Sequence, residues 1–129
     1  MSYKSSHLPT IASHIVSLLK TPDILFLQEI QDDSGPTNNG TVSANLTLST
    51  LTKTIASLSN VTYSFAVIDP VNNQDGGVGG GNIRVAYLYR PEVIELIAGP
   101  AGNATQAVAV EGPSGAPKLR YVLRTVPQD

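Results

Sequence analysis

The chain contains 129 residues, of which 41% are hydrophobic and 14% are charged, and it has neither Cys nor Trp. These values describe one globular domain, and they exclude a disordered tail, a disulfide framework and a thiolate zinc site. Ten acidic and eight basic side chains give a formal net charge of -2, which excludes the strongly basic surface of many nucleic-acid-binding domains and a polybasic membrane patch.

The first predicted element is a helix over residues 6–20. Its apolar residues are spaced three and four apart, and Pro9 suits the first turn. After Thr21 and Pro22, the continuously apolar run Ile24–Leu27 predicts a strand over residues 23–27. Such a run is typical of a strand that is buried on both faces of a parallel or mixed sheet, and this one is predicted to end at Gln28.

A polar loop over residues 31–41 precedes a second predicted helix, whose apolar residues repeat at intervals of three and four: Leu48, Leu51, Ile55 and Leu58. Strands are predicted over residues 61–68 and 82–89, with a Gly-rich loop over residues 69–81 between them. In the second of these strands one alternating set consists of Ile83, Val85, Tyr87 and Tyr89, and the other of Asn82, Arg84, Ala86 and Leu88.

The rest of the chain gives weaker signals. Residues 93–97 are predicted to be a hairpin partner, residues 98–117 a Gly/Pro/Ala-rich linker and residues 119–126 a last strand. Helices that alternate with early strands, followed by consecutive strands, predict an α/β fold of the α+β type with a mixed β-sheet and flanking helices. Because no strand precedes the first helix, we expect residues 1–129 to be a partial domain that is cut at both ends.

The most informative polar pair is Gln28-Glu29, directly after the predicted buried strand. Ligands of open α/β sheets lie beyond the carboxyl ends of the strands, and Mg²⁺ prefers one or two carboxylates together with water and phosphate oxygens. Glu29 is therefore a candidate metal ligand, and the alternative is a carboxylate that begins a solvated loop. Asp32 and Asp33 follow Glu29 closely, and each is either a further candidate metal ligand or a solvated loop carboxylate.

Other catalytic motifs are excluded. The Gly-rich loop has Asn82 where a dinucleotide fingerprint needs Gly and where a P-loop needs Lys, and it leads into a strand instead of a helix. Val71 and Asn82 also occupy the first and twelfth positions of a would-be calcium loop. His7 and His14 lie on the first helix with no nucleophile motif around any serine, so we expect them to be surface or partly buried helix residues.

Four Asn-x-Ser/Thr sequons predict glycosylation and secretion of the parent protein. The N-terminal residues lack the apolar core of a signal peptide, and the chain has no apolar run of about eighteen residues that would predict a membrane helix. Chance occurrence remains the alternative for each sequon. The candidate glycosylation sites are Asn39, Asn45, Asn60 and Asn103.

Two segments resemble the endonuclease/exonuclease/phosphatase superfamily, which has the deoxyribonuclease I-like fold. They are Pro22–Asp32, which includes the letters LQE, and Gly80–Pro91, which includes GGNIRVAYLYRP; Asp69-Pro70 and Asp75–Gly77 lie between them. The resemblance runs from about Ile11 to Leu96 and is closest to large secreted nuclease-like proteins of fungi. It implies a four-layer α/β sandwich of two mixed sheets with helices outside, and Mg²⁺-dependent hydrolysis of phosphodiesters or phosphomonoesters.

The same resemblance implies roles for single residues. Glu29 matches the metal-binding glutamate of the family, with Gln28 beside it, and Asn82 and Arg84 match the substrate or phosphate side. Members of the deoxyribonuclease I type carry an acidic residue near Ile83 that orients the catalytic histidine, and here the residue is apolar.

The family's first strand with its Asn should precede the chain, and its catalytic His, Asp-x-Asn and Asp-His should follow it. The resemblance therefore implies that residues 1–129 lack the first strand and the C-terminal half of the domain. It predicts a fragment of a Mg²⁺-dependent phosphodiesterase or nuclease-type hydrolase, with nucleic acid or another phosphodiester as substrate and with no obligate protein partner and no membrane. The alternatives are a catalytically inactive, truncated or degenerate copy, and a sphingomyelinase-like or phosphatase-like member that acts on other phosphoesters.

Overall fold

A computed structural model describes residues 1–2, 4–96, 103–105, 108–114 and 118–121. The chain divides into two compact units, Met1–Leu96 and Ile97–Asp129. The first unit contains α1 (Leu8–Ser17), β1 (Ile24–Ile30), α2 (Asn45–Ser59), β2 (Ser64–Val67) and β3 (Arg84–Tyr89). The second contains an antiparallel hairpin of β4 (Val108–Glu111) and β5 (Lys118–Tyr121).

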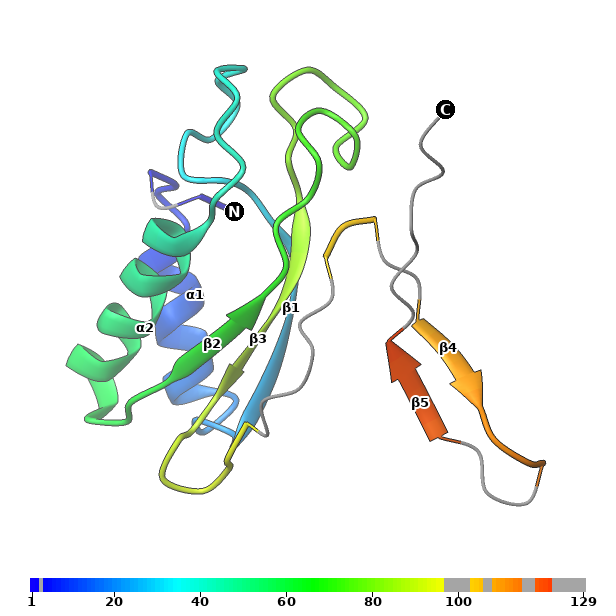
Figure 1. The fold of residues 1–129 in the computed structure, drawn as a ribbon. Coiled ribbons are helices and arrows are strands. Elements are labelled where there is room, and N and C mark those ends of the chain that lie inside the picture. Colours follow the sequence, from blue (N-terminus) through cyan, green and yellow to red (C-terminus); the bar gives the residue numbers. More distant parts are fainter. Residues whose placement is uncertain (3, 97–102, 106–107, 115–117, 122–129) are drawn as a thin grey trace. The chain divides into compact units, whose positions relative to one another are not determined.

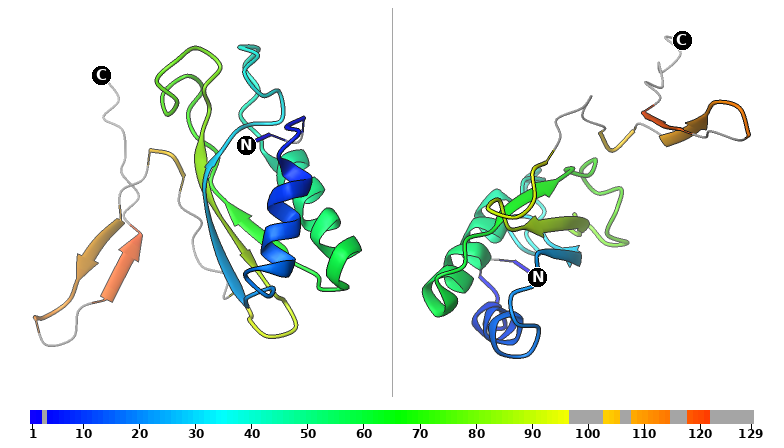
Figure 2. Two further views of the ribbon diagram at one scale, coloured as in Figure 1. Left: turned by 180° about the vertical axis from the view of Figure 1, so that it is seen from behind. Right: turned by 90° about the horizontal axis from the view of Figure 1, so that it is seen from below.

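The first unit is a small α+β domain, which confirms the general fold class that the sequence predicted. Its sheet has the order β1-β3-β2, and β3 in the centre runs antiparallel to both neighbours. Both helices pack on the same face of this sheet, as the views in Figures 1 and 2 show. The mixed sheet that we expected is therefore not present in the described strands, since both pairings of β3 are antiparallel.

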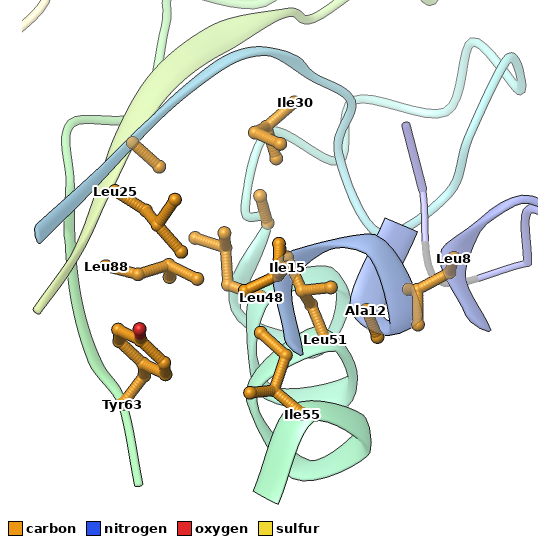
Figure 3. Packing of buried hydrophobic residues seen from close by; sticks show 12 residues of the cluster. Leu8, Ala12, Ile15, Leu25, Ile30, Leu48, Leu51, Ile55, Tyr63 and Leu88 are labelled. Atoms are coloured by element: carbon orange, nitrogen blue, oxygen red, sulfur yellow. The ribbon is translucent and has the colours of Figure 1, made fainter. Parts of the chain in front are cut away.

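The core lies between the two helices and the sheet (Figure 3). The predicted periodicity of the second helix is confirmed over most of its length, because its apolar residues at intervals of three and four point into this core. The buried hydrophobic residues are Leu8, Ala12, Ile15, Leu25, Ile30, Ala44, Leu48, Leu51, Ile55, Tyr63, Ala86 and Leu88.

The first helix is shorter than predicted. It ends after Ser17, and Leu18 and Leu19 are exposed although they continue the apolar pattern. Lys20 and Thr21 then take positive φ values of 59° and 49°, which reverse the chain so that β1 can return along the sheet.

The outer face of the sheet, opposite the helices, is apolar and open. The strand predicted over residues 23–27 exists, but only one of its faces is covered: Leu25 is buried, whereas Ile24 and Phe26 are 53% and 49% exposed. In β3 the covered face carries Arg84, Ala86 and Leu88, while Val85 and Tyr87 are exposed. Burial on both faces, as predicted for the first strand, is therefore wrong for this structure.

Three predictions for the C-terminal part also differ from the structure. Residues 91–93 form a turn instead of starting a hairpin strand, and the predicted linker contains β4. The last predicted strand begins one residue early, at Lys118 of β5, and its residues 122–126 lie outside the described residues.

Candidate functional site

A bulge interrupts β1 where the sequence placed the candidate metal ligand. Pairing with β3 is regular up to Leu27 and resumes at Ile30. Two residues of β1, Gln28 and Glu29, therefore lie opposite one residue of β3, Val85. The strand continues through this pair instead of ending at it, and bulges of this kind turn side chains in new directions next to functional sites.

Glu29 has a backbone conformation that L-residues rarely adopt. Its φ is 54°, and its side chain is exposed. The Met1 α-ammonium donates a hydrogen bond of 2.8 Å to the Glu29 carbonyl oxygen. Burial lowers the pKa of this ammonium, and the negative charge of Glu29 opposes the effect. The bulge thus presents the Glu29 carboxylate to solvent, where a hydrated cation can reach it.

Gln28 and Glu29 line an open depression of about 310 Å³ together with Ile83, Arg84 and Val85. Three of the four residues that the resemblance assigned to a metal or phosphate site therefore meet at one place, although more than fifty positions separate them along the chain. The fourth, Asn82, does not line the depression.

Arg84 is a buried cation in the wall of this depression, and its side chain is 3% exposed. Its guanidinium forms an ion pair with Asp69, and Nη2 donates a hydrogen bond of 2.8 Å to the Asn82 carbonyl oxygen. Burial lowers the pKa of Arg84, while the negative charges of Asp69 and Asp32 oppose this shift. Within the described residues its Nε has no hydrogen-bond partner.

Asn82 holds two loops together. The two hydrogens of its Nδ2 are shared among three acceptors, Asp32 Oδ2 at 3.0 Å, the Thr41 carbonyl oxygen at 2.9 Å and Asn72 Oδ1 at 3.0 Å. Its Oδ1 accepts a 2.7 Å hydrogen bond from the Asn73 backbone N–H. The side chain is buried and its polar atoms are all engaged, so in this structure it joins the loop after β1 to the loop before β3. These two loops lie at the same end of the sheet (Figure 1).

Asp32 is fully buried, which the sequence did not predict. Besides the Asn82 amide, its carboxylate accepts hydrogen bonds of 2.8 Å from the Ser34 backbone N–H and from the Ser34 hydroxyl. The two alternatives considered for this residue were a metal ligand and a solvated loop carboxylate. The structure instead gives it a place inside the two-loop network.

Asp33, in the loop that leads into α2, caps this helix from outside its N-cap position. Its carboxylate accepts hydrogen bonds from the backbone N–H groups of Leu46 (3.1 Å) and Thr47 (2.8 Å) and from the Ser43 hydroxyl (3.3 Å). Ala44 at the N-cap position has no side-chain oxygen, so the free N–H groups of the first helical turn take a remote carboxylate instead. In the sequence, a helix start without a capping side chain that follows an acidic loop was the signal from which this contact could have been predicted.

The remaining candidates lie away from the depression. His7 at the N-cap of α1 and His14 within this helix are both exposed, as expected for surface residues. All four sequon asparagines are exposed: Asn39 in the loop after β1, Asn45 in the first turn of α2, Asn60 at its C-cap, and Asn103 in the second unit. Over the described residues, no three His, Asp or Glu side chains gather as a metal-binding group.

No family model, no curated protein sequence and no solved structure matches this chain. Across the part of the chain that the structure describes, no helix has the length and apolar character needed to cross a membrane.

Proposed function

We propose that this chain carries part of a Mg²⁺-dependent phosphoesterase site in which Glu29 binds the metal. The observation that carries the proposal is the depression that Gln28, Glu29 and Arg84 line together. It combines an exposed carboxylate with a buried guanidinium, so a cation and a phosphate oxygen each find an opposite charge within one site.

The donor atoms suit Mg²⁺. A Glu carboxylate and a Gln amide oxygen are hard ligands, and Mg²⁺ retains several waters, so it needs no closed cage of protein side chains. When bound, the ion supplies polarisation of the phosphoryl group and stabilisation of the leaving oxygen. Glu29 would hold it through its carboxylate, and Gln28 would add its amide oxygen or orient the strand end.

Arg84 and Asn82 have different tasks in this proposal. Arg84 places a positive charge in the wall of the depression, where Asp69 fixes the guanidinium and a phosphate group gains a favourable field. Asn82 supports the phosphate side indirectly, since its amide holds the two loops next to Arg84. The substrate class is a phosphodiester such as nucleic acid, and phospholipid or sugar phosphates are the alternatives.

The larger architecture in the proposal is the four-layer sandwich, of which residues 1–129 form a part. The exposed outer face of the sheet supports it, because Phe26 and Tyr87 pack their rings 4.9 Å apart on a face that is otherwise left to water. A second sheet packed there would cover this face, as in other sheet-on-sheet folds. Secretion and glycosylation of the parent protein complete the proposal, and the exposure of the four sequon asparagines is compatible with them.

The metal site is tested by mapping Mn²⁺, a paramagnetic substitute for Mg²⁺, on the full chain by NMR. We expect selective broadening of the backbone amides of residues 28–30 and 83–85. Glu29→Gln should abolish this broadening, whereas Glu95→Gln, which removes another exposed carboxylate, should leave it unchanged. Broadening centred elsewhere, or retained in Glu29→Gln, would overturn the assignment of Glu29.

The substrate is tested with supercoiled plasmid, sphingomyelin vesicles and sugar phosphates in the presence of Mg²⁺. Residues 1–129 should bind the metal without cleaving any of them, since His7 and His14 lie on the helix layer and the described site holds no general base. Cleavage that depends on Glu29 would contradict the partial-domain proposal. In a longer chain that contains residues 1–129, loss of cleavage in Glu29→Gln supports the enzyme, and unchanged cleavage contradicts it.

A further inference from the structure

The loop between β1 and α2 contains Asn39 followed by Gly40, the only Asn-Gly pair in the sequence. Both residues are exposed. Gly40 has φ +82°, and a Cβ built on it would meet no atom within 4 Å. Gly40 therefore has no side chain of its own, and no atom of a residue beyond its chain neighbours lies where one would stand.

The Asn39 side chain is hydrogen-bonded to the backbone that follows it. Its Oδ1 accepts a hydrogen bond of 3.1 Å from the Thr41 backbone N–H, which folds the side-chain amide back along the following backbone and polarises its carbonyl group. Among the described residues, neither the Gly40 N–H nor the Asn39 Nδ2 has a hydrogen-bond partner. The Gly40 nitrogen and the Asn39 Nδ2 are thus both free of hydrogen bonds, while the hydrogen bond to Oδ1 restrains the Asn39 Cγ atom.

We propose that Asn39 is a site of spontaneous deamidation through a succinimide. The Gly40 backbone nitrogen gives up its proton to solvent base and attacks Cγ of Asn39. The N–Cγ bond forms and the Cγ–Nδ2 bond breaks, and Nδ2 leaves as ammonia after taking a proton from solvent. Water then opens the five-membered ring at either carbonyl, which leaves an aspartyl or an isoaspartyl residue at position 39. The overall reaction consumes one water molecule, releases one ammonia molecule and needs no oxidant or cofactor.

This modification has two structural consequences. The product has lost Nδ2, so deamidation and N-glycosylation of Asn39 exclude each other. The isoaspartyl product also adds a methylene to the backbone at position 39, two residues before Thr41, whose carbonyl oxygen accepts the Asn82 hydrogen bond. The modification therefore alters one anchor of the two-loop network.

Other asparagines in the chain serve as internal controls. Asn60 is exposed, but the following residue, Val61, is β-branched and its N–H donates a hydrogen bond of 3.2 Å to the Ser59 hydroxyl. Asn103 is exposed and is followed by Ala104. Because Asn39 is followed by a residue without a Cβ and with a free N–H, it should react faster than either of them.

The test is to incubate the full, unglycosylated chain at physiological temperature and mildly alkaline pH and to follow deamidation by peptide mapping with detection of isoaspartate. We expect Asn39 to react at least about tenfold faster than Asn60 and Asn103, which corresponds to about 1.4 kcal/mol in activation free energy. Gly40→Ala should slow the reaction at Asn39 by a similar factor. Equal rates at the three asparagines, or an unmodified Asn39 beside measurable deamidation elsewhere, would overturn the proposal. This comparison within the wild-type chain holds whether or not Gly40→Ala folds.

Discussion

The Asn82 amide donates a 3.0 Å hydrogen bond to the Asp32 carboxylate across fifty residues of sequence, and both side chains are buried. The bond joins the loop after β1 to the loop before β3, next to the depression that Glu29 and Arg84 line. A buried carboxylate is stable only where hydrogen bonds replace its hydration, so this contact fixes the end of the sheet at which we place the site.

Asn82→Ala should destabilise the chain by about 1–3 kcal/mol, because it leaves buried polar groups of both loops without a partner. The measurement is the urea midpoint at constant m-value. Gln74→Ala in the same loop is the control, since Gln74 is exposed and only its backbone is hydrogen-bonded. Equal midpoints for the two variants would contradict the role of Asn82.

Asp33→Ala should cost about 0.5–2 kcal/mol, the range for loss of a helix N-cap. The reason is that the N–H groups of Leu46 and Thr47 lose their carboxylate acceptor. Hydrogen exchange should quicken in the first turn of α2. Asp75→Ala removes an exposed carboxylate from the other loop and should leave this turn protected as before. Unaltered exchange in Asp33→Ala would argue against the remote cap.

Leu51→Ala should cost about 2–5 kcal/mol, because Leu51 is fully buried between the helices and the sheet. Leu58→Ala on the same helix should stay within about 0.5 kcal/mol, since Leu58 is 52% exposed. Thermal or urea unfolding measures both. A similar loss in both variants would mean that α2 packs with a different face inward.

Tyr63 should make stability fall at alkaline pH. Its hydroxyl donates a hydrogen bond to the Pro22 carbonyl oxygen, and burial raises its pKa above the ordinary value of 10.0, which the positive charge of Arg90 partly opposes. The folded state therefore favours the protonated phenol, so this stabilisation is complete below pH 10.0 and is lost as the pH rises through the folded pKa. Tyr63→Phe should be less stable than wild type at neutral pH, and the difference should shrink at alkaline pH. A difference that is constant with pH would contradict this assignment.

The outer face of the sheet should make the chain self-associate. Phe26 and Tyr87 are each about half exposed and adjacent, so they form a continuous apolar surface instead of scattered single residues. Phe26→Ser with Tyr87→Ser should lower the concentration dependence of the sedimentation coefficient. Leu18→Ser, at a more exposed leucine that follows the last residue of α1, should not change it. A wild-type chain that remains monomeric at all concentrations would be the contrary result.

The sequence predicted the helices and strands better than it predicted which of their faces are buried. The spacing of Leu48, Leu51 and Ile55 identifies the buried side of α2, because helical periodicity depends only on the chain's own sequence. The alternation in β3 identifies a strand, but it does not say which set faces the core. The structure buries Arg84 and exposes Tyr87, and the burial of the guanidinium depends on the Asp69 carboxylate, fifteen residues earlier, and on the Asn82 carbonyl oxygen. No local pattern contains that information.

The position of the depression coincides with the polar pair that the sequence singled out, but its detail could not be predicted from the sequence. The change from apolar residues to Gln28-Glu29 was expected to end the strand, and it instead coincides with the bulge within β1, where the depression lies. The bulge that exposes Glu29 arises from pairing with β3, so it has no signal within β1 itself. The contacts of Asn82 and Asp33 likewise depend on which loops meet, which the order of elements leaves open.

Binding of Mg²⁺ at Glu29 is tested most directly by urea unfolding of the full chain over a series of Mg²⁺ concentrations. A ligand that binds only the folded state stabilises it by RT ln(1 + [L]/Kd), which is about 2.7 kcal/mol at a hundredfold excess over Kd. The wild type and Glu95→Gln should gain stability along this curve, and Glu29→Gln should gain none. A wild type that does not respond to Mg²⁺, or a response that survives in Glu29→Gln, would contradict the proposed metal site.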